Sequence, residues 1–220
     1  MLLFAKGSTT DSLSREDVRA GLFQALEMLG ERRRVLAIPP DFTRYHSQAG
    51  MLSQLLWDYY RERLVDVLPA IGTHYTMTDE EIEKMFASIP RSLFRVHDWR
   101  SGLVTLGEVP SQFVCDVSEG KVEYTIPIQV DKLLVEGRHD LILSIGQVVP
   151  HEVIGMANYN KNILIGTGGS EAINKTHFLG AAYGMERIMG RVNTPVRMVL
   201  NYGSERFAKH LPIVYVQTVI

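Results

Sequence analysis

The sequence has almost no cysteine, because Cys115 is the only one among 220 residues. A single thiol excludes an intrachain disulfide framework and any zinc or iron–sulfur site built from several thiolates, so a reducing, cytoplasmic location is expected. Long hydrophobic runs are also missing: residues 35–38 and 141–143 are far too short to span a bilayer, which predicts no membrane partner. Neither sign of charge dominates, since 23 Lys and Arg stand against 25 Asp and Glu, and nothing indicates a nucleic-acid partner.

The residues that are present alternate between short apolar runs and amphipathic stretches. Capping pairs, Ser14 with Asp17 and Thr78 with Glu81, predict the starts of two helices, and apolar spacing predicts a third over residues 51–59. Short apolar runs predict buried strands at residues 1–5, 35–38, 65–71, 94–97, 141–145, 163–165, 196–200 and 213–216. Strands that alternate with helices indicate an α/β fold with a mostly parallel, helix-covered sheet.

The stretch from 104 to 128 differs from this pattern. It contains three short β-like pieces, residues 104–106, 113–117 and 122–128, separated by Gly107, Pro110 and Gly120. We therefore expect a small antiparallel β insertion.

Polar side chains follow several of the predicted strands. Asp41 and Arg44 come after the strand that ends at residue 38, His74 after the strand that ends at 71, and His151 after the strand that ends at 145. The carboxyl ends of parallel strands meet at one edge of a sheet, where ligands bind. This edge is the predicted site.

A glycine-rich stretch, residues 166–170, follows the strand expected at 163–165. A glycine turn that enters a helix leaves backbone N–H groups free to bind a phosphate, so Gly168, Gly169 and Ser170 are candidates for a cofactor phosphate. The stretch matches neither a Walker loop nor a full dinucleotide fingerprint. A plain turn is an equally good interpretation.

Histidine carries protons near neutral pH and binds metals, which makes His74, His151 and His177 candidates. The other four histidines have simpler interpretations: His97 pairs structurally beside Asp98, and His46, His139 and His210 are surface groups. No His-x-x-x-His pair and no cysteine pair exist, so a metal would need ligands from a cofactor. Lys161 is either a solvated loop lysine or a desolvated nucleophile.

Taken in order, these motifs resemble the N-terminal portion of the lactate racemase family, the nickel-pincer-nucleotide 2-hydroxyacid racemases and epimerases. The segments that carry the resemblance are residues 40–44 (Pro-Asp-Phe-Thr-Arg), 72–74 (Gly-Thr-His), 97–98 (His-Asp) and 149–151 (Val-Pro-His), followed by Gly155, Lys161 and His177. Lys161 follows His151 by 10 residues and His177 follows it by 26, as in the family pattern.

The resemblance implies a role for each matched residue. His74 and His151 would be the acid/base pair on opposite faces of a 2-hydroxy acid substrate. Lys161 would carry the nickel-pincer nucleotide covalently, and His177 would complete the coordination of nickel. Asp41 and Arg44 would help to hold cofactor or substrate.

The sequence departs from the family at two points. The family's Gly-Phe-Ser-Gly-Gly-x-Lys run is replaced by Gly-Met-Ala-Asn-Tyr-Asn-Lys over residues 155–161. The resemblance therefore does not fix which 2-hydroxy acid is the substrate. Residues 1–220 are expected to form one N-terminal catalytic and cofactor-binding domain without the family's C-terminal domain, which would be its partner. The alternative function is a non-catalytic nucleotide- or metabolite-binding domain on the same scaffold.

Overall fold

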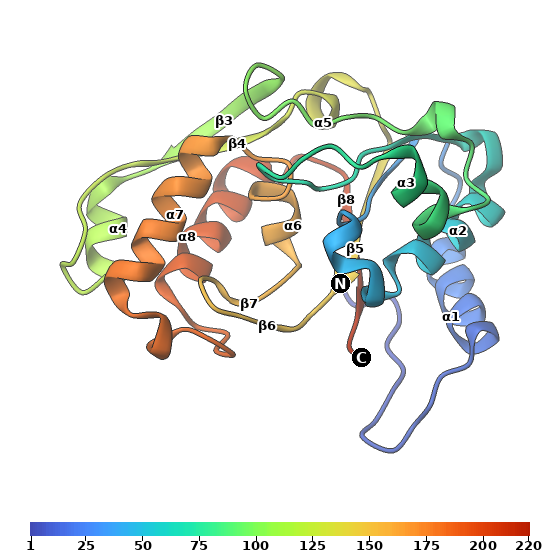
Figure 1. Ribbon diagram of the computed structural model, residues 1–220, viewed down its shortest axis with the longest axis horizontal. Helices are drawn as coiled ribbons and strands as arrows, with labels where there is room; N and C mark the ends of the chain where they lie inside the picture. The colour runs from blue at the N-terminus through green and yellow to red at the C-terminus, as the bar shows by residue number, and fades with distance from the viewer.

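The computed structural model describes residues 1–220 and centres on a four-stranded parallel sheet (Figure 1). The strand order is β2 (Leu64–Val67), β1 (Val35–Ile38), β5 (Leu141–Gln147) and β8 (Ile213–Thr218). In the register of the central strands, Val35 lies opposite Leu141 and Ile142 lies opposite Ile213. The predicted parallel sheet is therefore confirmed.

Two layers of helices cover this sheet, one on each face (Figure 1). One layer contains α1 (Arg15–Met28), α2 (Ala49–Tyr60) and α3 (Asp79–Phe86), and the other contains α6 (Asn160–Leu164), α7 (Ser170–Tyr183) and α8 (Pro195–Gly203). Strand β1 supplies both cores, since Val35 and Ala37 belong to the first hydrophobic cluster and Leu36 and Ile38 to the second. Alternate side chains of a strand point to opposite faces, so both sides of β1 are buried.

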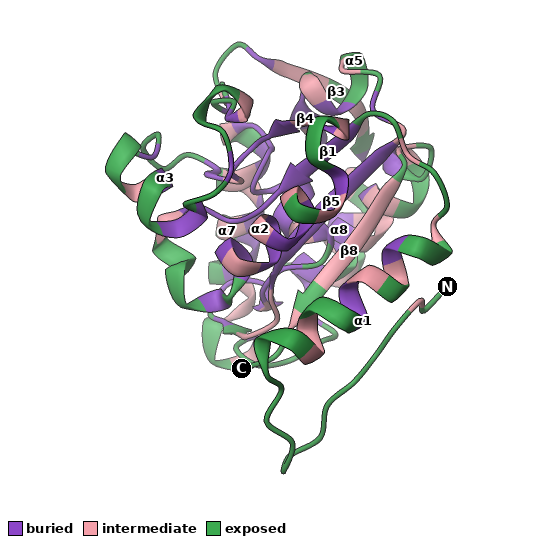
Figure 2. Ribbon diagram, turned by 90° about the vertical axis from the view of Figure 1, so that its right-hand side faces the viewer, coloured by how far each residue is buried: buried purple, intermediate pink, exposed green.

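Burial is deepest in the central strands (Figure 2). All residues of β1 are buried, whereas β8, at the sheet edge, is only partly covered. No helix in the structure has both the length and the apolar character needed to cross a membrane.

The capping predictions are confirmed. Ser14 and Asp17 form a capping box at the start of α1, and Thr78 and Glu81 form one at the start of α3. In each box the hydroxyl and the carboxylate satisfy backbone N–H groups that have no partner within the helix.

The insertion is also antiparallel, as expected. Strands β3 (Leu103–Val109) and β4 (Ile126–Asp131) pair side by side. The middle predicted piece is wrong, because residues 113–117 belong to helix α4 (Ser111–Val117), which begins directly after Pro110. Proline at the N-terminal boundary of a helix costs no hydrogen bond, so this residue starts the helix rather than separating strands.

Four further strand predictions are wrong. Residues 1–5 have no regular structure, residues 94–97 contribute only an isolated bridge from Phe94 to Val67, residues 163–165 lie in and directly after α6, and residues 196–200 lie in α8. The last two are short apolar runs buried in the second core, and burial alone does not distinguish a strand from a helix. Thr194 caps α8 and Pro195 opens it, which are helix-start signals.

The predicted strand at 65–71 ends at Val67, two residues before Pro69. The segment that follows β1 forms a 3₁₀ helix, η1 (Phe42–Ser47). The remaining short elements are the hairpin strands β6 (Pro150–His151) and β7 (Gly155–Met156), the helix α5 (Leu133–Glu136), the 3₁₀ turns η2 (Arg61–Arg63), η3 (Arg91–Leu93) and η4 (Met185–Arg187), and the π-helical turn η5 (Ser204–Ala208).

Candidate functional site

Three loops at one edge of the sheet carry four of the predicted site residues: Asp41, Arg44, His74 and His151. Strands β1, β2 and β5 are parallel neighbours, so the segments that follow them leave from the same edge. Those segments are η1 with Asp41 just before it, the turn at 72–74, and the β6–β7 hairpin. A hydrogen bond of 2.7 Å between His74 Nδ1 and Asp41 Oδ2 joins the first two.

Asp41 orients His74. The Asp41 carboxylate is buried, and its other oxygen accepts hydrogen bonds from the backbone N–H of Thr43 at 3.0 Å and from the Thr43 hydroxyl. His74 Nδ1 faces a carboxylate, which holds the ring proton on that nitrogen. Nε2 of the neutral ring therefore keeps its lone pair, and the largely exposed His74 side chain can accept a proton there.

The turn before His74 depends on a glycine. Gly72 has φ +57°, in the left-handed region, and its N–H donates to the carbonyl of Gly166 at 2.8 Å. This bond ties the His74 turn to the glycine-rich stretch, although the two lie far apart in the sequence.

His151 is held in the opposite hydrogen-bonding state. Its Nδ1 accepts the backbone N–H of Val153 at 3.1 Å and that of Ile154 at 3.4 Å. Burial, followed by the positive charge of Lys161, lowers the pKa of His151 to about 4. The ring is therefore neutral at pH 7, and because Nδ1 accepts, the proton lies on Nε2.

Lys161 lies in the first turn of α6 and is half-buried. The pKa of Lys161 is lowered to about 8, mainly because its ammonium is removed from water and secondly because the charge of Arg44 repels it. At pH 7 about a tenth of the Lys161 side chains are therefore free amine, the nucleophilic form, a far larger share than for an ordinary lysine. The solvated-lysine interpretation does not describe this environment.

Arg44 also acts on His151 and Glu152, since its charge contributes to the lowered pKa of each. Its guanidinium forms no ion pair and no side-chain hydrogen bond within the chain. Five donors in a planar fork remain free beside the site, a geometry that suits a carboxylate.

His177 presents one free nitrogen. Its Nδ1–H donates to the carbonyl of Ile173 at 2.7 Å, so Nε2 carries the lone pair that a metal would use. His177 lies near His151, because its charge contributes to the lowered pKa of that ring. The chain has no group of three or more His, Cys, Asp or Glu that could hold a metal, so His177 could supply only one ligand of a larger set.

The glycine-rich stretch follows helix α6, not a strand, so the sheet-edge argument does not apply to it. The Gly168 carbonyl accepts a hydrogen bond from His97 Nε2 at 3.0 Å, and Gly169 packs against Leu103 of β3 and Gln129 of β4. Ser170 begins α7, whose first turn has no side-chain cap. The N–H groups of that turn remain available, and the cofactor role of Gly168, Gly169 and Ser170 stays a prediction.

A model of the lactate racemase N-terminal domain matches residues 21–187 of the chain. The chain belongs to this family. It superposes on a protein from Thermotoga maritima with a TM-score of 0.84 and 29% identity, over 94% of this chain and 51% of that one. It superposes on the lactate racemase apoprotein from Thermoanaerobacterium thermosaccharolyticum with a TM-score of 0.68 and 22% identity, over 94% of this chain and 49% of that one. The chain thus spans about half the length of these solved structures. No curated protein matches it.

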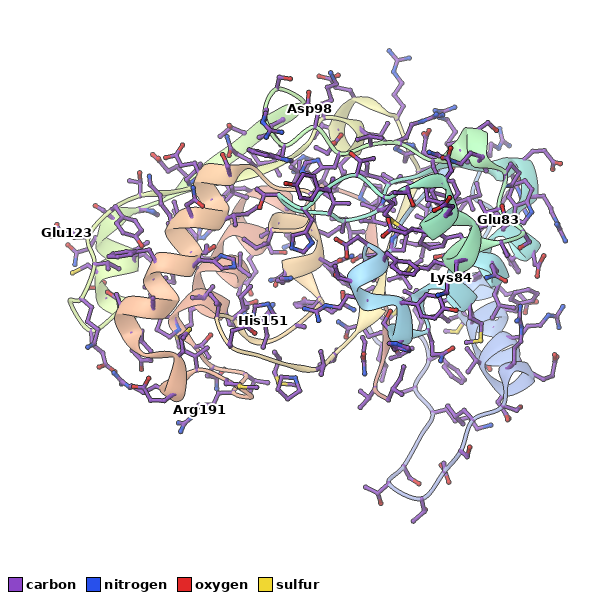
Figure 3. All side chains as sticks on the ribbon, in the orientation of Figure 1. Glu83, Lys84, Asp98, Glu123, His151 and Arg191 are labelled. Atoms are coloured by element: carbon purple, nitrogen blue, oxygen red, sulfur yellow. The ribbon has the colours of Figure 1, made fainter.

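In this lactate racemase N-terminal domain the structural pairing predicted for His97 is confirmed, and the surface position predicted for His139 is wrong. His97 pairs at 2.7 Å with Asp131 of β4, whereas the adjacent Asp98 caps its own turn at the edge of the molecule opposite His151 (Figure 3). His139 is buried and bonds Asp66 at 2.8 Å, so it is not a surface group. In both cases the partner is distant in the sequence.

Sequence reasoning missed Arg197. It lies in α8, is only 7% exposed and makes no ion pair, and its guanidinium donates to the Asn160 side-chain oxygen and to the Met156 carbonyl. Its presence inside the apolar run 196–200 was the available signal, because a buried arginine needs a specific reason. The segment between its two acceptors, Met156 and Asn160, contains the positions of the family's two replaced glycines: Asn158 has φ +61° and Tyr159 has φ +55°.

Proposed function

We propose that this domain contributes to the racemisation or epimerisation of a 2-hydroxy acid, as the N-terminal part of a longer nickel-pincer-nucleotide enzyme. The supporting observation is the pair of histidines at one sheet edge in opposite states: His74 has a free lone pair on Nε2, and His151 has a proton there. Inversion of a carbinol centre needs a proton acceptor for one enantiomer and a proton donor for the other.

His74 takes the hydroxyl proton of the substrate at Nε2. The imidazolium that forms is stabilised by the Asp41 carboxylate on Nδ1, at 2.7 Å. Thr43 in turn holds Asp41, so the acceptor nitrogen keeps one direction.

His151 holds a proton on Nε2 and supplies a hydrogen bond to the substrate oxygen. Its lowered pKa makes it a poor base while Lys161 is charged. Neutralisation of Lys161 removes one of the causes of that depression, so the pKa of His151 rises and the ring becomes a better proton carrier.

The residues fit the nickel-pincer nucleotide on three observations. The Lys161 amine has a lowered pKa and suits covalent attachment, His177 Nε2 is a free imidazole ligand, and the buried side-chain N–H of Asn158, three residues before Lys161, has no partner. When bound, the group supplies a reversible acceptor for hydride from carbon 2. The phosphate would lie on Gly168, Gly169 and Ser170 if the first turn of α7 serves as the anion site.

Arg44 orients the substrate. Its unpaired guanidinium can bind the substrate carboxylate through two parallel hydrogen bonds, which a lysine ammonium does less well. This contact would hold carbon 2 between the two histidines.

The test is intact-protein mass with nickel analysis, on protein produced with and without the enzymes that make the cofactor. We expect an adduct on Lys161 together with bound nickel, and no adduct in Lys161→Met. His177→Ala should lose nickel and keep the adduct. Absence of both adduct and nickel in the wild-type protein would favour the alternative, a binding domain without this chemistry.

For a loaded protein, His74→Ala and His151→Ala should each suppress inversion of the hydroxy acid without unfolding the chain. Full activity in either variant would remove the acid/base assignment. Asp41→Asn should reduce the rate less than His74→Ala does, since it disturbs the orientation of the ring and leaves the ring in place.

A further inference from the structure

The segment that leads into Lys161 has an unusual backbone. Asn158 and Tyr159 are consecutive, neither is glycine, and both have positive φ. Asparagine tolerates the left-handed region, but Tyr159 has φ +55° and ψ −138°, a combination that is essentially restricted to glycine. Such a conformation persists only where the surroundings hold it in place.

The backbone of this segment controls Lys161 directly. The Asn158 carbonyl accepts the N–H of Lys161 at 3.2 Å, and the Tyr159 carbonyl accepts the N–H of Asn162 at 3.1 Å. These bonds form the turn that begins α6. If residues 158 and 159 relax to ordinary φ values, the direction of the Lys161 side chain changes with them.

Arg197 of α8 contacts the segment at both ends. One guanidinium nitrogen donates to the Met156 carbonyl, before the strained pair, and another donates to the Asn160 side-chain oxygen, after it. The Asn160 amide nitrogen continues the network to Asn201 of α8 at 2.8 Å. A planar fork with donors in fixed directions suits this bridge, and a lysine could not span it.

The aromatic side chain of Tyr159 adds a weaker contact. Its ring lies on Tyr215 of β8, with ring centroids 4.4 Å apart. The ring is nevertheless nearly half exposed, so Arg197 remains the buried anchor of the segment.

Burial of this arginine has a cost that the fold alone does not explain. Arg197 has no carboxylate partner, and its burial lowers its own pKa. A buried charge without a counter-ion is destabilising, because no opposite charge offsets the hydration that it loses. The positive charge of Arg197 acts on Lys161, where it disfavours the ammonium form and so helps to lower the pKa.

We propose that Arg197 is a positioning residue that clamps residues 156–160 in their strained conformation and thereby keeps Lys161 desolvated, aimed into the site and reactive as an amine. The inference concerns the unloaded chain, and its relevance to the enzyme rests on the proposed role of Lys161. It assigns to α8 a part in the site that sequence motifs do not show.

Lys161 also faces other charges. Arg44 disfavours its ammonium, whereas Asp41 and Glu152 favour it. Arg44 lies on η1, Asp41 lies directly before η1, and Glu152 lies on the β6–β7 hairpin. None of them belongs to α8, so they stay in place when α8 is altered. A change in the reactivity of Lys161 when Arg197 is replaced therefore comes from the lost contacts of Arg197 and from its lost charge.

The test measures the reactivity of Lys161 against pH in the unloaded chain. Acetic anhydride is applied in short pulses between pH 6 and pH 11, about the range that covers free and buried lysine, and peptide mass spectrometry reads acetylation of each lysine. Exposed Lys209 serves as the internal reference for reagent concentration. Wild-type protein should show a labelling midpoint for Lys161 near 8.

In Arg197→Met the midpoint should move towards the ordinary lysine value of 10.5. A rise of one pH unit lowers labelling at neutral pH about tenfold, and we expect at least that. Arg197→Lys keeps the charge but not the fork, so it should also lose reactivity. Arg191→Met is the matched control, because this arginine is exposed, points away from the molecule (Figure 3) and leaves the segment untouched.

Rescue separates clamping from a purely electrostatic effect. Tyr159→Gly removes the backbone strain, so in combination with Arg197→Met it should recover part of the lost reactivity. If Arg197→Met does not fold, Asn160→Ala, which removes one of the two acceptors, should lower reactivity in the same direction.

An unchanged Lys161 midpoint in folded Arg197→Met, or in Asn160→Ala where the first variant does not fold, overturns the inference. A shift that Tyr159→Gly does not reduce also overturns the clamp. None of these readouts needs the cofactor, so a failed adduct test and a failed labelling test are distinct results.

Discussion

The neutral state of buried His151 should make the stability of the domain depend on pH in a defined window. Burial and the Lys161 charge lower its pKa from 6.5 to about 4. Between these two values the unfolded chain binds a proton that the folded chain excludes. The free energy of unfolding is therefore unaffected by this residue above pH 6.5 and falls as the pH drops towards 4.

The size of the effect follows from the same values. A pKa change from 6.5 to about 4 corresponds to about 3 kcal/mol, because each tenfold change in proton affinity is worth about 1.4 kcal/mol. Water at the open edge of the site screens part of this energy, so we expect a loss of about 2 kcal/mol.

The assay compares wild type with His151→Asn by urea unfolding at several pH values. The Asn side-chain oxygen can replace Nδ1 as acceptor for the Val153 N–H, and it does not titrate. Subtraction of the two stability curves removes the contribution of all other titrating groups. The difference should favour the variant by about 2 kcal/mol more at pH 4 than at pH 7.5.

A control variant at an exposed position, His210→Asn, measures the effect of replacing any histidine by asparagine. If the curves of wild type and His151→Asn run parallel from pH 7.5 to pH 4, the folded chain accepts the proton on His151. The description of a neutral, buried ring with its proton on Nε2 would then be wrong.

Three further predictions concern the surroundings of the site. Lys161→Met should raise the pKa of His151 above about 4, because it removes the second cause of its depression after burial; NMR titration of the imidazole measures this. His97→Phe should lower the free energy of unfolding by about 3 kcal/mol, measured in urea, because the buried Asp131 carboxylate loses a hydrogen-bond partner. Gly155→Ala should cost about 2 kcal/mol in thermal unfolding, because its φ is +97° and a Cβ would meet a backbone oxygen.

Each of these has its own contrary result. A His151 pKa that stays at about 4 in Lys161→Met would show that burial alone sets it. If His97→Phe lowers the free energy of unfolding by well under 1 kcal/mol, about the contribution of an exposed ion pair, then water has replaced the lost partner of Asp131. Wild-type stability in Gly155→Ala would show that the β6–β7 hairpin relaxes freely.

Much of the fold was accessible from local sequence signals. The two capping boxes and the apolar runs of β1 and β5 specify their elements through neighbours within a few residues. The same local reasoning failed at α6 and α8, because short apolar runs buried in one core look alike whether they are helical or extended. For α8 the helix-start signals Thr194 and Pro195 were present in the sequence, whereas α6 is held by its packing against α8, β4 and β5.

The sequence by itself singled out the candidate residues: His74, His151, Lys161 and His177 stand in an ordered motif pattern, and the family match covers residues 21–187. Tertiary structure alone decided their states. The proton positions on His74 and His151 depend on Asp41 and on backbone N–H groups that fold into place, and the lowered pKa of Lys161 depends on burial. Hydrogen-bond direction and desolvation are properties of three-dimensional surroundings, so a linear pattern names the residues and leaves their protonation to the fold.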